Sequence, residues 1–150
     1  MSILTDFVVA DISEAQRIGD SLSPSWQFEG LGEKGIDHVK LATLYALLTD
    51  QPYDPDVLMN EETLLYIASE NGPWVQQVPP DMVSRLANLP ESEYSRVAQA
   101  WARTEEFDPK FSGLTSAEAI TFAEAFIRRF AVLARQSLAE NKILMMWTCL

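Results

Sequence analysis

Hydrophobic residues recur along the chain with two spacings, which together predict an alternation of strands and helices. Phe7 to Val9 form a short apolar run rich in β-branched residues, which is typical of a strand. Ser13 and Gln16 follow with the spacing of a capping box, so a helix is expected from there to about Leu22. The segment 36–48 has apolar residues on nearly every side, which predicts a largely buried helix.

The middle of the chain has a weaker pattern. The prolines and aspartates of 51–59 are good turn formers, so this segment is predicted to be a loop. The segments 64–69 and 74–78 flank Asn71-Gly72, a dipeptide typical of hairpin turns. Asn60, with two glutamates after it, could instead start a helix that ends at Gly72. The hairpin is the favoured prediction.

The second half of the chain is predominantly helical in pattern. Pro79 and Pro90 each precede a segment with apolar residues at helical spacing, which predicts two linked helices. Thr115 and Glu118 form a second capping box, from which the longest predicted helix runs to Asn141.

The chain ends in an uncharged apolar segment, 143–149, which predicts a buried strand. With 150 residues, the chain has the usual length of one domain. The predicted fold is therefore a single α+β domain, residues 1–150. Its small, mostly antiparallel sheet includes both terminal strands and is covered by about five helices.

The charge of the chain indicates which kinds of partner it can bind. The net charge is −11, and residues 1–75 hold 13 acidic against 3 basic residues, a net charge of −10. Binding to nucleic acid or to an anionic membrane needs clustered Lys and Arg, so neither is expected. No Lys or Arg lies between Lys40 and Arg85. An acidic surface that suits a basic protein partner is predicted there, at Asp50, Asp54, Asp56, Glu61 and Glu62.

Targeting and cysteine use favour a cytoplasmic protein. The first sixteen residues contain acids but no Lys or Arg, unlike a signal peptide. The longest apolar stretch, Leu41 to Leu48, is far shorter than the ~20 residues that cross a bilayer. The single Cys149 has no partner in the chain for a disulfide, which fits a reducing compartment. It is interpreted as a small apolar strand residue.

No cofactor or metal site is predicted. Gly30, Gly32 and Gly35 have the spacing of a dinucleotide-binding turn, but no buried strand precedes them and the neighbouring Glu29 and Glu33 would repel phosphate. A flexible turn is the preferred interpretation.

Potential metal ligands are equally incomplete. The single histidine, His38, excludes a histidine cluster. Asp54 and Asp56 lack the glycine and glutamate that complete a calcium loop.

Five residues are candidates for a small-molecule pocket: Trp26, Phe28, Asp37, His38 and Tyr45. Trp26 and Phe28 alternate in a loop-like segment, where they could line a pocket or anchor a partner, although burial in the core is the favoured interpretation. His38 lies seven residues before Tyr45 on the same helical face, where the two could stack or hydrogen-bond. A structural role for His38 is favoured, because no nucleophile is placed beside it.

The order of elements resembles the YfbM-like family of uncharacterised bacterial proteins. The resemblance is carried by DFVVADISEAQRI, GIDHVKLATLYALLTD, VPPDMVSRLANL and the last 25 residues, FIRRFAVLARQSLAENKILMMWTCL. In that family a short strand and helix are followed by a similar buried helix, and a long helix leads into a terminal strand. The resemblance implies a fold of this kind but no functional residue.

No assembled nucleophile, base and orienting group is recognisable, so catalytic residues are not predicted. The leading hypothesis is a non-catalytic binding or regulatory protein with an acidic interaction surface. An immunity-type protein that neutralises a basic toxin or nuclease is a narrower form of it. The alternative is a small enzyme or ligand-binding protein that uses a pocket near Trp26, His38 and Tyr45.

Overall fold

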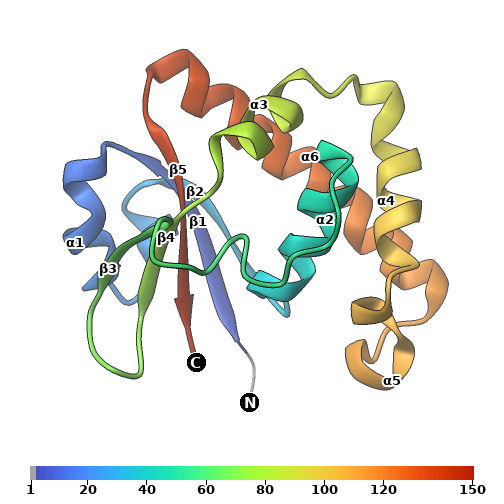
Figure 1. Ribbon diagram of the computed structural model, residues 1–150, viewed down its shortest axis with the longest axis horizontal. Helices are drawn as coiled ribbons and strands as arrows, with labels where there is room; N and C mark the ends of the chain where they lie inside the picture. The colour runs from blue at the N-terminus through green and yellow to red at the C-terminus, as the bar shows by residue number, and fades with distance from the viewer. Residues whose placement is uncertain (1–2) are drawn as a thin grey trace.

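The computed structural model describes residues 3–150 and contains one five-stranded antiparallel sheet (Figure 1). The order of strands across the sheet is β2-β1-β5-β4-β3. The two terminal strands pair at its centre, with Leu4 opposite Cys149 and Ala10 opposite Ile143. The strands are β1 (Leu4–Ala10), β2 (Glu29–Lys34), β3 (Leu64–Ile67), β4 (Trp74–Gln77) and β5 (Ile143–Cys149). The predicted α+β class and the antiparallel sheet with both terminal strands are confirmed.

Helices cover both faces of this sheet unequally (Figure 1). On one face lie α2, α3, α4 and α6, and on the other lies the short α1. No helix within residues 3–150 is both long enough and apolar enough to cross a bilayer. The helices are α1 (Ala15–Gly19), α2 (His38–Thr49), α3 (Pro80–Asn88), α4 (Tyr94–Ala102), α5 (Pro109–Ser112) and α6 (Ser116–Glu140).

Side chains of the central strands alternate between two hydrophobic cores, as the pleat of a strand requires. Phe7 and Val9 of β1 face α6 and belong to the larger core. Val8 and Ala10 face the opposite way and pack with α1 in the smaller core. Because both faces of β1 and β5 are covered, these strands are almost continuously apolar in sequence.

The longest helix begins and ends where the sequence predicts. The Thr115 hydroxyl accepts a hydrogen bond from the Glu118 N–H, and the Glu118 carboxylate accepts one from the Thr115 N–H. These hydrogen bonds lower the pKa of Glu118. At the other end, Asn141 takes the left-handed conformation, φ 54°, that closes the helix.

Replacement of Thr115 by alanine is expected to lower the free energy of unfolding by about 1 kcal/mol, because an N–H of the first turn loses its acceptor. Urea unfolding measures the change. Thr121→Ala is the matched control, since Thr121 is exposed within the same helix and its hydroxyl donates to the Ala117 carbonyl oxygen instead of capping an N–H. Equal losses in the two variants would show that the cap does not stabilise α6.

The β3–β4 hairpin is confirmed, and the alternative of a helix from Asn60 to Gly72 is wrong. Gly72 has φ 84°, a conformation that favours glycine, and a cis peptide bond joins it to Pro73. The preference of Asn71-Gly72 for a turn therefore prevails over the preference of Asn60 for the start of a helix.

The predicted capping box at Ser13 is wrong. A 3-10 turn occupies Ile12–Glu14, and α1 starts only at Ala15 with no side-chain cap. It ends at Gly19 rather than Leu22, and the next residue, Asp20, accepts a hydrogen bond from the Tyr66 hydroxyl at 2.8 Å. The residues after Gly19 therefore contact β3 and do not form the further helical turn that the sequence pattern predicts.

The predicted flexible turn at Gly30 and Gly32 is also wrong, since both lie in the edge strand β2. A Cβ atom at Gly30 would lie 2.0 Å from the carbonyl oxygen of Phe7. The glycine therefore permits β2 to approach β1 closely. Close packing of two strands, rather than phosphate binding or flexibility, accounts for the glycine spacing.

Candidate functional site

The loop between α2 and β3 carries the five acids of the predicted acidic surface, and all five are exposed. Asp50 closes α2 in the left-handed conformation, with φ 53°. The remaining four follow within twelve residues, on a segment of turns that contains no helix or strand. We call Asp50, Asp54, Asp56, Glu61 and Glu62 the acidic loop.

Hydrogen bonds and one buried side chain hold the acidic loop in place. The Asp54 Oδ1 atom accepts a hydrogen bond from the Asp56 N–H at 3.0 Å. Asn60 Oδ1 accepts one from the Glu62 N–H at 2.9 Å. Leu58, only 1% exposed, anchors the loop in the larger core. The carboxylates are therefore carried on a defined backbone rather than on a free segment.

Tyr53 marks the place where acids from other elements join the loop. Burial raises the pKa of its hydroxyl, and the negative charges of Glu106, Asp37, Asp56 and Asp54 raise this pKa further. Asp37 precedes α2, and Glu106 lies in the 3-10 turn Glu105–Phe107 that follows α4. Segments distant in sequence thus bring carboxylates to one tyrosine.

Asp81, at the start of α3, joins the same region through Tyr45. The Tyr45 hydroxyl donates a hydrogen bond to Asp81 Oδ2 at 2.6 Å. This bond, burial and the charges of Asp81 and Asp54 raise the pKa of Tyr45 to about 12, although a hydrogen bond with Thr49 lowers it. The phenol therefore stays protonated at neutral pH and serves to join α2 to α3.

Asp81→Asn is expected to lower the pKa of Tyr45 from about 12 towards the ordinary value of about 10. The raised pKa contributes stability that is fully present below about pH 10 and is lost as the pH rises through about 12. Ultraviolet titration of tyrosinate absorbance measures the shift. The Tyr66→Phe background removes another tyrosine with a raised pKa. A Tyr45 pKa unchanged by Asp81→Asn would contradict the assigned hydrogen bond.

Within residues 3–150, no Lys, Arg or His nitrogen lies within 4.0 Å of a carboxylate of the acidic loop, of Asp37, of Asp81 or of Glu106. The nearby Lys40 instead donates to the carbonyl oxygen of Gly35 at 2.8 Å and lies 5.5 Å from the Phe107 ring centroid. The carboxylates in this region are thus not neutralised by ion pairs of the chain itself.

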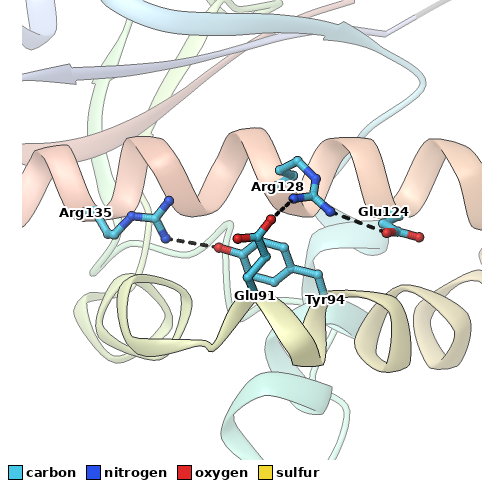
Figure 2. Close-up of polar contacts among 5 residues, drawn as sticks. All are labelled: Glu91, Tyr94, Glu124, Arg128 and Arg135. Carbon is cyan, nitrogen blue, oxygen red and sulfur yellow. Dashed lines mark hydrogen bonds and ion pairs between the residues drawn. The ribbon is translucent and has the colours of Figure 1, made fainter.

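The α4–α6 interface shows the opposite arrangement (Figure 2). Arg128 on α6 forms ion pairs with Glu91 and Glu124, and its guanidinium lies 5.3 Å from the centre of the Tyr94 ring. Arg135 donates to the Tyr94 hydroxyl at 3.0 Å. At this interface the basic side chains of Arg128 and Arg135 bind acidic or hydroxyl groups of the chain itself.

The five predicted pocket residues do not gather at one site. Trp26 lies in the 3-10 turn Pro24–Trp26 and is 88% exposed, so its predicted burial in the core is wrong. Phe28 packs against the smaller core, with the Arg17 guanidinium 4.6 Å from its ring centroid. Tyr45 belongs to the larger core on the other face of the sheet.

His38 and Asp37 lie at the start of α2. Asp37 Oδ1 accepts a hydrogen bond from the Lys40 N–H at 2.8 Å, which makes Asp37 the N-cap of the helix. His38 is half-buried as the first helical residue. The hydroxyl of Tyr45 is engaged by Asp81 and not by His38, which leaves His38 without the predicted hydrogen bond to Tyr45.

Among residues 3–150, no three His, Cys, Asp or Glu side chains are grouped in a way that could hold a metal ion. The acids around Tyr53 and Tyr45 thus form a dispersed surface rather than a coordination site. Such a surface can attract several cationic side chains at once.

Sequence reasoning did not assign Asp81 and Glu106 to the site. Glu106 lies in a separate turn after α4, which stops at Ala102. The paired carboxylates at Glu105 and Glu106 were the available signal.

Comparison with family models, with curated proteins and with solved structures finds no match to this chain. The resemblance to the YfbM-like family therefore stays a prediction.

Proposed function

We propose that this protein is a non-catalytic binding protein whose acidic loop, with Asp37, Asp81 and Glu106, engages a basic protein partner. The observation that supports the proposal most strongly is the run of five exposed carboxylates in the acidic loop, none of which forms an ion pair with a Lys, Arg or His of residues 3–150. The charges of Asp37, Glu106 and Asp81 act on Tyr53 or Tyr45 together with that of Asp54 from this loop. We call these eight residues the acidic surface.

Several carboxylates are needed, because a single exposed ion pair contributes only about 0.2–1 kcal/mol. A surface with many charges of one sign also steers an oppositely charged partner and accelerates its association. Tyr53, 47% exposed among these acids, offers an aromatic contact of the kind enriched in protein interfaces.

A partner of matching chemistry presents clustered Lys and Arg. A basic toxin or nuclease neutralised by an immunity-type protein is one such partner. Tyr45 has no catalytic role in this proposal, because its pKa of about 12 is far from that of a general acid or base at neutral pH.

The probe that tests the proposal is a fluorescent octalysine peptide, with octaglutamate as the matched control. We expect octalysine to bind and its affinity to fall as salt rises past about 0.1 M, where the Debye length is about 10 Å. Fluorescence anisotropy measures both. Failure to bind octalysine even at low salt would overturn the proposal, and so would equal binding of octaglutamate.

A further inference from the structure

A separate pocket of about 200 Å³ opens beside β1, on the face of the sheet that α1 covers. Its lining includes three residues of the central sheet and three at its rim. Asp6, Gly32 and Trp147, one on each of three neighbouring strands, form the base, and the exposed Leu4, Leu22 and Lys34 form the rim. Ser23 and Glu33 complete the lining, and the Glu33 carboxylate forms an ion pair with Arg129. None of the residues that line this pocket belongs to the acidic surface.

The three residues at the base form one row across three strands. Asp6 of β1 is directly opposite Gly32 of β2 and Trp147 of β5. Residues opposite one another in antiparallel strands project to the same face, with Cβ atoms about 5 Å apart. A Cβ at Gly32 would lie 2.8 Å from Asp6 Oδ1, so the glycine allows the Asp6 carboxylate to lie close against β2.

Both polar groups of the row have unused hydrogen-bonding capacity. Asp6 is only 9% exposed; its Oδ2 atom accepts from the Ser25 N–H at 2.9 Å, whereas Oδ1 accepts no hydrogen bond within residues 3–150. Trp147 is 3% exposed, and its Nε1–H has no acceptor in the same residues. A buried polar group without a partner is costly, so the unpaired Trp147 Nε1–H points to a ligand. Asp6 Oδ1 remains open to solvent and is a free acceptor in the same row.

The rim adds an apolar and a cationic contact. Leu22 is 92% exposed and Leu4 is 42% exposed, so both offer apolar surface beside the pocket. Lys34 follows Gly32 by two residues in β2, so its side chain leaves the same face as Asp6. Lys34 is exposed and forms no ion pair with the acids of residues 3–150.

We propose that this pocket binds a free α-amino acid with an aliphatic side chain. The ligand's ammonium group donates to the Asp6 carboxylate, and its carboxylate accepts from the Trp147 indole and faces the Lys34 ammonium. Its side chain packs on Leu4 and Leu22. An ammonium and a carboxylate bonded to the same carbon atom match the charges that the pocket presents, and the volume suits a ligand of this size.

L-Leucine is the probe, and the Trp147 indole N–H signal in nuclear magnetic resonance spectra is the readout. The signal is assigned by its loss in Trp147→Phe. L-Leucine is expected to shift it, with saturation below about 10 mM. The analogues 4-methylpentanoate, which lacks the ammonium, and 3-methylbutylamine, which lacks the carboxylate, are expected to bind at least about tenfold more weakly.

Two variants test the charged contacts, and a third is the control. Asp6→Asn and Lys34→Met are each expected to weaken L-leucine binding about tenfold, whereas the exposed Trp26→Phe leaves it unchanged. Lys34 is exposed, so Lys34→Met is expected to fold normally.

An unshifted Trp147 signal at about 10 mM L-leucine would overturn the proposal. Equal binding of 4-methylpentanoate would overturn it as well, because the pocket would then recognise only an apolar group. Octalysine binding is independent of both results, so this proposal and the proposed function can fail separately.

Discussion

Amide replacement of Asp54, Asp56 and Glu62 is expected to weaken octalysine binding about tenfold, because three exposed ion pairs together contribute roughly 1–2 kcal/mol. Asn at position 54 retains the oxygen that accepts from the residue 56 N–H, so the turn is preserved. Fluorescence anisotropy at low salt measures the change. The difference between the variant and the natural chain is expected to shrink as salt rises.

A matched variant separates local from overall charge. Asp11→Asn, Glu29→Gln and Glu70→Gln also change the net charge from −11 to −8, at exposed residues without ion pairs in the described chain. These changes are expected to weaken binding less than about twofold, because they leave the acidic surface intact. Equal weakening by both triple variants would mean that octalysine responds only to net charge.

Phe126→Ala is expected to lower the free energy of unfolding by about 3–5 kcal/mol, the cost of removing a large aromatic side chain from a packed core. Phe126 is 1% exposed. Its ring centroid lies 5.6 Å from that of Phe7, 5.6 Å from that of Trp101 and 5.1 Å from that of Phe130. It therefore connects β1, α4 and α6, and its loss affects three elements at once.

Urea unfolding measures this effect, with Phe111→Ala as the control. Phe111 is 74% exposed on α5, so its removal is expected to change the free energy of unfolding by less than about 0.5 kcal/mol. A loss below about 1 kcal/mol for Phe126→Ala would contradict the packing of the larger core around this residue.

Elements with strong local signals were predicted well. The α6 helix has a complete capping box at Thr115, and Asn141 at its other end readily adopts the left-handed conformation. Both ends of the helix are therefore determined by residues close in sequence. The uncharged segment 143–149 forms the central strand β5, because both of its faces are covered.

Tertiary contacts overrode local signals elsewhere. Gly30 and Gly32 resemble a turn in sequence, yet they are glycines because β2 approaches β1 and the Asp6 side chain closely. Trp26 was expected in the core on grounds of hydrophobicity, but the turn that contains it directs it outward. Propensity describes a segment alone and cannot include its neighbour across a sheet.

The candidate site was predictable only in part. The shortage of basic residues between Lys40 and Arg85 correctly located exposed acids at 50–62. The contributions of Asp37 and Glu106 depend on how α2 and the turn after α4 come together around Tyr53, and the sequence spacing carries no information about that distance.

The most direct test of the acidic surface is a titration of isotope-labelled protein with octalysine, followed by the backbone amide signals in nuclear magnetic resonance spectra. The largest shifts are expected within residues 50–62 and around Asp37, Asp81 and Glu106. Shifts spread evenly over all exposed acids, or centred on Glu91 and Glu124 at the α4–α6 interface, would contradict the account.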